Sequence, residues 1–116
     1  MKETRLGDFE ETILLLVGIL GDEAYAFKIA EEFESQVKRN SSIGAVHSAL
    51  NRLGEKGFLT SEMTKPISER GGRRKRIYSI TASGKKALED SRNLKVSLWN
   101  QYPAFNFQSL TFGLEK

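Results

Sequence analysis

The sequence predicts a mainly α-helical fold with one small β-hairpin, a winged helix-turn-helix followed by a C-terminal dimerisation helix. The first observation behind this prediction is a pair of helical segments joined by a short polar link. The second is a strongly basic segment between two short strand-like segments that follow directly. The third is a long last helical segment whose apolar positions step at about 3.5 residues. We expect the winged helix-turn-helix in residues 1–81 and the dimerisation helix with its tail in residues 82–116.

The first helical segment is expected from Phe9 to about Leu20. Asp8 and Glu11 precede its apolar run with the spacing of a capping box. The run is apolar nearly all round, so we expect the helix to be sandwiched between other elements or partly buried against a second subunit. A second helix is expected from Ala24 or Ala26 to about Gln36. Its inner side is predicted to carry Phe27, Ala30, Phe33 and Val37, and Phe9, Phe27 and Phe33 are expected in the core.

The third helical segment, from Ser42 to Lys56, has the pattern of a helix that enters a DNA groove. Ser41 or Ser42 is the predicted N-cap, and Gly57 is expected to end the helix. The face opposite the apolar stripe carries mostly short, polar side chains, so the helix backbone can approach DNA closely. On that face, Asn51 and Arg52 can donate hydrogen bonds to base edges or phosphates. The alternative is an ordinary amphipathic helix with a solvated face. The predicted buried stripe is Ile43, Val46, Leu50 and Leu53, and the predicted DNA contacts are Ser42, Gly44, Ala45, His47, Ser48, Asn51 and Arg52.

The predicted hairpin, or wing, concentrates positive charge at its tip. Its first strand begins with Phe58 and Leu59, and its second runs from Arg76 to Ile80. Between Thr64 and Arg76 there are six Lys and Arg residues against Glu69 alone, although the whole chain has a net charge of only +3. A solvated charge run is the alternative, but a basic loop beside a recognition helix favours contact with phosphates or a minor groove. The candidates are Arg70, Arg73, Arg74 and Lys75, while Arg76 opens the strand and has a structural role as its alternative.

The last helical segment is expected from Ala82 to about Gln101, with Thr81 as its N-cap and Pro103 after its end. Its apolar seam is too thin to be stable alone in water, so it should pair with another helix. Trp99 and Tyr102 could stack an effector, but plain interface packing is the favoured interpretation. The predicted dimer interface is Leu88, Ser91, Leu94, Lys95, Leu98, Trp99 and Tyr102.

Composition excludes several classes of function. The chain has no cysteine, and its single histidine, His47, has no partners at the spacing of a metal site or a catalytic triad. We therefore expect no catalytic residue, no metal and no cofactor. The longest apolar run, Ile13 to Leu20, is too short to span a membrane, and its acidic flank does not suit a signal peptide. A cytoplasmic protein is expected.

Four stretches together resemble one family. They are LGDFEETILLLV at Leu6–Val17, AYAFKIAEEFE at Ala24–Glu34, SIGAVHSALNRLGEKGFL at Ser42–Leu59 and GGRRKRIYSITASGKKAL at Gly71–Leu88. In their order and spacing they are similar to the PadR-type winged-helix transcriptional regulators, in particular the short subgroup with a single C-terminal helix. The resemblance implies a homodimer paired through the last helix, with the first helix contributing. It also implies a repressor of a nearby gene, often one for detoxification or transport, and a possible small-molecule effector. Many members have Tyr-Pro where this chain has His47-Ser48, which leaves the operator sequence open.

The sequence thus favours a homodimeric repressor that reads a pseudo-palindromic site in double-stranded DNA. The alternative is a winged-helix protein–protein interaction module whose wing binds an acidic partner without specific DNA binding. An enzyme is a distant third, because the chain has no nucleotide-cradling glycine motif and little else on which to build a catalytic site.

Overall fold

The structure is a computed structural model that describes residues 5–64 and 74–103. The described elements are α1 (Asp8–Leu20), a 3-10 turn η1 (Gly21–Glu23), α2 (Ala26–Val37), α3 (Ile43–Glu55), β1 (Leu59–Met63), β2 (Arg76–Ile80) and α4 (Ala82–Gln101). The two strands form one antiparallel hairpin, in register from Leu59 opposite Ile80 to Met63 opposite Arg76. This arrangement confirms the predicted mainly α-helical fold with a small hairpin.

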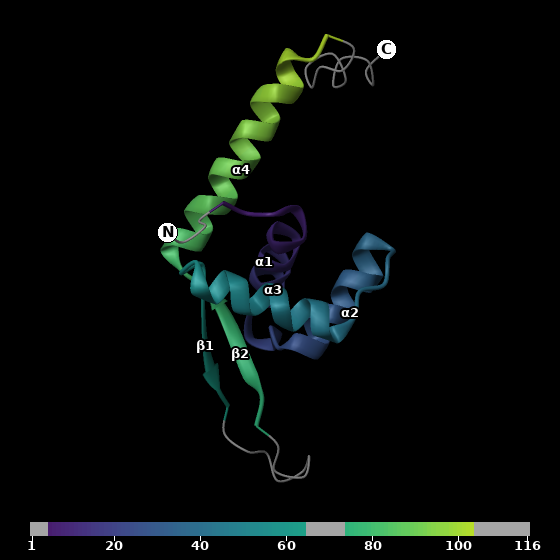
Figure 1. The fold of residues 1–116 in the computed structure, drawn as a ribbon, viewed down its shortest axis with the longest axis vertical. Helices are drawn as coiled ribbons and strands as arrows, with labels where there is room; N and C mark the ends of the chain where they lie inside the picture. Colours follow the sequence, from purple (N-terminus) through teal and green to yellow (C-terminus); the bar gives the residue numbers. More distant parts are fainter. Residues whose placement is uncertain (1–4, 65–73, 104–116) are drawn as a thin grey trace.

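Figure 1 shows α1, α2 and α3 packed into one body, from which the hairpin and α4 leave on opposite sides. The core lies where α1, α2 and α3 meet, because each of these helices has one apolar stripe that the other two cover. Its largest fully buried side chains are Ile13, Leu14 and Val17 of α1, Ile29 and Phe33 of α2, and Val46, Leu50 and Leu53 of α3. Tyr78 of β2 joins this core, and its backbone N–H donates to the carbonyl of Ala24 at 2.9 Å. The hairpin is therefore attached to the helical body at its base.

Two residues predicted to be buried are exposed. Phe27 was expected in the core but is 62% exposed, because it precedes buried Ile29 by two residues and so lies on the opposite side of α2. Ile43 was expected in the buried stripe of α3 but is 45% exposed, because it is the first residue of the helix and lies beyond the edge of the core. Val46, Leu50 and Leu53 of the same stripe are buried as predicted.

The start of α1 also differs from the prediction. The helix begins at Asp8, so its N-cap is Gly7 and not Asp8. The residue three positions after this N-cap is Glu10, whose Oε1 accepts the Gly7 backbone N–H at 3.0 Å. Glu11, the residue predicted to reach back, instead accepts a hydrogen bond from Lys95 of α4 at 2.7 Å. A start one residue earlier therefore gives the capping role to Glu10.

The junction between the hairpin and α4 is built from short contacts around Thr81. As predicted, Thr81 is the N-cap of α4, and its Oγ1 accepts the Gly84 backbone N–H at 3.0 Å. The same hydroxyl donates to the carbonyl of Gly57 at 2.7 Å, and the Thr81 N–H donates to the carbonyl of Phe58 at 3.1 Å. The start of α4 is thus tied to the segment that leaves α3.

Candidate nucleic-acid interface

The buried side of α3, the predicted recognition helix, sets its orientation. The Ser42 Oγ accepts the Ala45 N–H at 3.0 Å and fixes the start of the helix, as predicted for an N-cap. Val46, Ala49, Leu50 and Leu53 face the core. At about 3.6 residues per turn, the side opposite these four forms an outward row. This row, which we call the outward row of α3, contains the exposed residues Gly44, Ser48, Asn51 and Glu55.

The predicted DNA contacts of α3 lie on or beside this row. Ser42, His47 and Arg52 are exposed together with Gly44, Ser48 and Asn51, whereas Ala45 is half-buried. By helical period, His47 borders the outward row on one side, and Ala45 and Arg52 border it on the other. The row offers small residues for close backbone approach and Asn51 as a donor and acceptor that can pair with an adenine edge. Contact with DNA at each of these residues stays a prediction.

Sequence reasoning missed three charged residues near this surface. Glu55 is exposed one turn after Asn51, and a carboxylate there could accept from a cytosine amino group or repel a phosphate. The four-residue step from Asn51 was the signal that could have found it. Lys38 and Arg39 are exposed in the link between α2 and α3, with Lys38 in the left-handed conformation at φ 64°. Two basic residues in a helix-turn-helix link are themselves candidates for phosphate contacts.

The loop end of the wing strands is held by backbone and side-chain contacts. Thr64 donates its N–H to the Lys75 carbonyl at 2.7 Å, and the Lys75 N–H donates to the Thr64 Oγ1 at 2.9 Å. The Lys75 ammonium lies 3.9 Å from the centroid of the Tyr25 ring, a cation–π contact that ties the wing to the start of α2. A structural role for Lys75 thus stands beside its predicted DNA contact.

The other basic residues of the wing divide into three groups. Arg74 is exposed. The Arg76 Nη1 donates to the Ser61 Oγ of the opposite strand at 3.0 Å, which is consistent with the structural alternative for this residue. Lys65, Arg70 and Arg73 lie outside the described residues.

A buried carboxylate supports the recognition helix from behind. Glu10 of α1 is 6% exposed; its Oε2 accepts from Arg52 Nε at 2.6 Å, and its Oε1 accepts from Lys56 Nζ at 2.6 Å. Burial by itself would raise the pKa of this carboxyl group. The hydrogen bonds from the Gly7 N–H, Lys56 and Arg52 outweigh burial and lower the pKa of Glu10 to about 2. Glu10 is therefore ionised at neutral pH and pairs with two cations of the recognition helix and its C-cap.

The outer half of α4 carries apolar side chains into solvent. Leu94, Leu98, Trp99 and Tyr102, all predicted dimer residues, are between 45% and 61% exposed. Lys95 instead pairs with Glu11, while Leu88 and Ser91 are half-buried against the body. The rings of Trp99 and Tyr102 meet edge to face, with centroids 6.0 Å apart. Sequence reasoning did not single out three other exposed apolar residues of these two helices, Leu15 and Ile19 of α1 and Val96 of α4.

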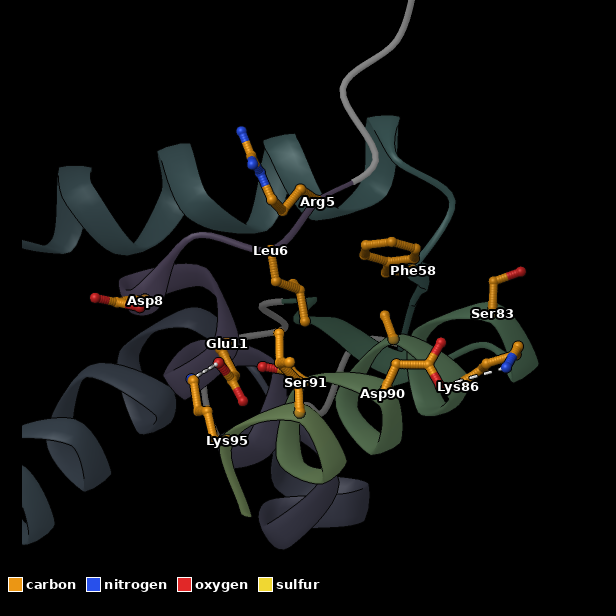
Figure 2. A pocket seen from close by; sticks show the side chains of 12 residues that line it. Arg5, Leu6, Asp8, Glu11, Phe58, Ser83, Lys86, Asp90, Ser91 and Lys95 are labelled. Atoms are coloured by element: carbon orange, nitrogen blue, oxygen red, sulfur yellow. Dashed lines mark hydrogen bonds and ion pairs between the residues drawn. The ribbon is translucent and has the colours of Figure 1, made fainter. Parts of the chain in front are cut away.

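A groove of about 580 Å³ runs along α4 beside this apolar surface. Figure 2 shows its lining: Leu6 and Phe58 lie across from the α4 residues Ser83, Lys86, Asp90 and Ser91. The Glu11–Lys95 ion pair lies at one end of the groove, and its hydrogen bond raises the pKa of Lys95. The pair joins α1 to the middle of α4.

The described residues contain no group of three or more metal-ligating side chains close enough to hold a metal ion. In the same ranges, no helix is sufficiently long and apolar to cross a membrane.

Comparisons with known proteins agree with this geometry. Residues 14–90 match the model of the transcriptional regulator PadR-like family. The chain belongs to the PadR-like family. Because members of this family are transcriptional regulators, the expectation that the chain is not an enzyme is confirmed. No curated protein matches the chain.

Solved structures share the fold. A PadR-like transcription factor from Bacteroides fragilis has a TM-score of 0.64 and 23% identity, covering 78% of this chain and 82% of that one. A PadR family regulator from Clostridium difficile R20291 has a TM-score of 0.61 and 27% identity, covering 79% and 96%. Bacillus subtilis PadR, solved in complex with operator DNA, has a TM-score of 0.58 and 23% identity over 72% of this chain, and only 45% of that protein is covered.

Proposed function

We propose that this PadR-like chain is a sequence-specific DNA-binding repressor that acts as a homodimer on a pseudo-palindromic operator in the cytoplasm. The observation that carries the proposal is the outward row of α3, which leaves a slim polar face on a helix whose other side is fully buried. A helix of this kind can enter a major groove, because its small residues let the backbone approach the DNA closely and its side-chain amide groups can bind base edges. The operator-bound structure of Bacillus subtilis PadR, a protein of the same fold, supports the proposal.

In this proposal the two parts of the surface have different tasks. Ser48 and Asn51 of the outward row read base edges, with His47 beside them. The wing contributes phosphate contacts through Arg74 together with Arg70 and Arg73. Phosphate contacts raise affinity for all sequences and make it sensitive to salt, whereas base contacts raise affinity only for the operator.

Dimerisation would cover the apolar surface of α4. Leu94, Leu98, Trp99 and Tyr102 are exposed apolar side chains on the outer half of one helix, the kind of surface that marks a protein–protein contact. A second copy, related by a two-fold axis, offers the same surface and would bury both. Two recognition helices would then face half-sites about one helical turn apart.

An effector pocket at the same interface is a further part of the proposal. Trp99 and Tyr102 offer an edge-to-face aromatic pair that a planar ligand could stack against. A ligand that changed the packing of two α4 helices would change the separation of both recognition helices at once. Trp99 fluorescence during ligand addition reports on this site, and a ligand that releases DNA without changing the fluorescence would contradict this effector route.

The test is binding of the protein to the DNA upstream of its own gene, compared with a scrambled fragment, across a salt series. The expected result is a preference of about 1000-fold or more for the native fragment. Asn51→Ala should reduce that preference, while Arg73→Ala combined with Arg74→Ala should weaken binding to both fragments and flatten the salt dependence. Arg92→Ala removes a positive charge from α4 and serves as the control. Equal, weak binding to both fragments would contradict operator recognition at that site.

A further inference from the structure

Glu10 is buried, charged and shared between two cations of the recognition helix region. Among the described residues it is the one buried charged side chain. Its Oε1 accepts from the Gly7 N–H and Lys56 Nζ, and its Oε2 accepts from Arg52 Nε. The partners lie 42 and 46 residues away along the chain, so the contact joins the start of α1 to the end of α3. A buried charge is costly unless its geometry is fixed, which makes this cluster a rigid support.

The two cations differ in what they leave exposed. The Lys56 side chain is 10% exposed, and its Nζ also donates to the backbone carbonyl of Arg5 at 2.6 Å. Lys56 is therefore enclosed by the protein. The Arg52 side chain is 49% exposed. Among the described residues, its guanidinium group makes one hydrogen bond, from Nε to Glu10. The other N–H donors of a guanidinium group, which form a fixed planar fork, remain available to a second acceptor.

Arg52 also has the position that a phosphate contact requires. It follows Asn51 directly and lies one turn after Ser48, so it borders the outward row on the side that faces α1. When the centre of a recognition helix faces base edges, its borders face the two phosphate backbones of the groove. Arginine binds phosphate well because its planar group can donate two parallel hydrogen bonds.

We propose that Glu10 is a positioning residue of the DNA interface: it holds Arg52 by the Nε so that the remaining guanidinium N–H groups bind one backbone phosphate. This inference rests on the DNA binding proposed above and adds the buried carboxylate that prepares it. A guanidinium that is already fixed loses less conformational entropy when it binds, so its phosphate contact contributes more affinity than a flexible side chain would.

The matched variants are Arg52→Gln and Lys56→Gln. Each removes one positive charge from beside the same carboxylate. In Arg52→Gln the amide nitrogen takes the place of the Arg52 Nε that donates to Glu10, whereas in Lys56→Gln the side chain is one atom shorter than lysine. Arg52→Gln should weaken DNA binding by about tenfold or more, equally for operator and scrambled duplex. It should also lower the slope of log affinity against log salt by about 0.9, the value for one lost phosphate contact. Lys56→Gln should lower the melting temperature but leave the salt slope unchanged.

The role of Glu10 is tested by repeating Arg52→Gln in a Glu10→Gln background. If Glu10 positions Arg52, the loss of affinity caused by Arg52→Gln should fall from about tenfold to less than about threefold there, because the guanidinium is no longer held. An equal loss in both backgrounds would overturn the positioning role. An unchanged salt slope in Arg52→Gln, or the same slope change in Lys56→Gln, would overturn the phosphate contact.

Two results separate this inference from the proposed function. Phosphate contacts are independent of sequence, so the contrast between Arg52→Gln and Lys56→Gln can be measured on scrambled duplex even if no operator is recognised. If Glu10→Gln does not fold, as judged by circular dichroism, the contrast between the two single variants still decides whether Arg52 makes the contact. In that case Glu10→Asp, which keeps the charge but shortens the side chain, replaces it as the background.

Discussion

Gly84, in the first turn of α4, should be intolerant of even one added methyl group. A Cβ at this position would lie 2.4 Å from the carbonyl oxygen of Phe58, 2.9 Å from Ile80 Cγ2 and 3.1 Å from the Phe58 carbonyl carbon. The first contact is with backbone, which cannot rotate away as the end of a side chain can. In Gly84→Ala, α4 and the segment after α3 must therefore move apart.

The expected cost follows from what that movement disturbs. Overpacking of a tight contact costs about 1–3 kcal/mol. The Thr81 N–H bond to the Phe58 carbonyl and the Thr81 Oγ1 bond to the Gly57 carbonyl lie at the same place, and each is worth about 1 kcal/mol. Alanine recovers about 0.5–1 kcal/mol through its higher helix propensity. We expect Gly84→Ala to lower the free energy of unfolding by about 2–4 kcal/mol.

Urea and thermal unfolding followed by circular dichroism, at one fixed protein concentration, measure this cost. The control is Gly54→Ala in α3, where an added Cβ meets nothing within 4 Å. That variant should be stabilised by about 0.5–1 kcal/mol, because the same substitution now brings only its helix propensity. If Gly84→Ala were as stable as the unsubstituted protein, the close approach of α4 to Phe58 would be wrong.

Three further predictions concern the carboxylate of Glu10, the contact of the wing residue Lys75 with Tyr25, and the surface of α4. Because folding lowers the pKa of Glu10 from 4.5 to about 2, its stabilisation is complete above about pH 4.5 and is lost as the pH falls towards 2. Glu10→Gln should therefore cost roughly 2–3 kcal/mol at pH 7, less than the full shift implies because Arg52 is half exposed. Tyr25→Leu removes the ring beneath the Lys75 ammonium and should lower the free energy of unfolding by about 0.5–1 kcal/mol. Leu98→Glu places a charge on the exposed patch of α4 and should shift a dimer to monomer in sedimentation equilibrium.

Each of these predictions has its own control. For Glu10→Gln, unfolding measured from pH 7 to pH 3 should show the gap to the unsubstituted protein closing, and a constant gap would contradict the role of the ionised carboxylate. Tyr25→Phe keeps an aromatic face and should be nearly neutral, so a loss as large as in Tyr25→Leu would point away from the cation–π contact. For the dimer, Asn93→Glu adds the same charge to another face of α4 and should leave the mass unchanged.

Local rules predicted most of the fold. The bounds of α3 and α4 follow from Ser42 and Thr81, whose hydroxyl groups accept N–H groups three residues later. These contacts are local, so residue type and spacing are sufficient to predict them. Phe27 was mispredicted because the buried face of α2 is centred on Ile29 and Phe33, and the sequence alone did not decide between that face and the one that includes Phe27. Ile43 was mispredicted because helical periodicity tells which residues share a face, but not where the neighbouring helices stop covering it.

The candidate site was predictable only in part, because its supports are distant in sequence. Glu10 lies in an acidic segment at the start of a helix, where sequence alone predicts a glutamate that stays in solvent near the helix N-terminus. Its burial depends on Arg52 and Lys56, which come from another helix, and no local pattern reports that pairing. The contact of Lys75 with Tyr25 is hidden for the same reason. Gly44, Ser48 and Asn51 of the outward row could be predicted as exposed because that prediction needs only the helical period.

The contacts around α3 also connect it to α4. Glu10 and its neighbour Glu11 lie on the same turn of α1: Glu10 holds the end of α3, and Glu11 holds Lys95 in the middle of α4. Thr81 and Gly84 tie the start of α4 to the segment that leaves α3. The predicted recognition helix and α4 are thus connected at two places, through the hydrogen bonds of Thr81 and through the ion pairs of Glu10 and Glu11. A change in the direction of α4 would therefore be transmitted to α3 as a rotation of the body, since neither connection contains a flexible linker.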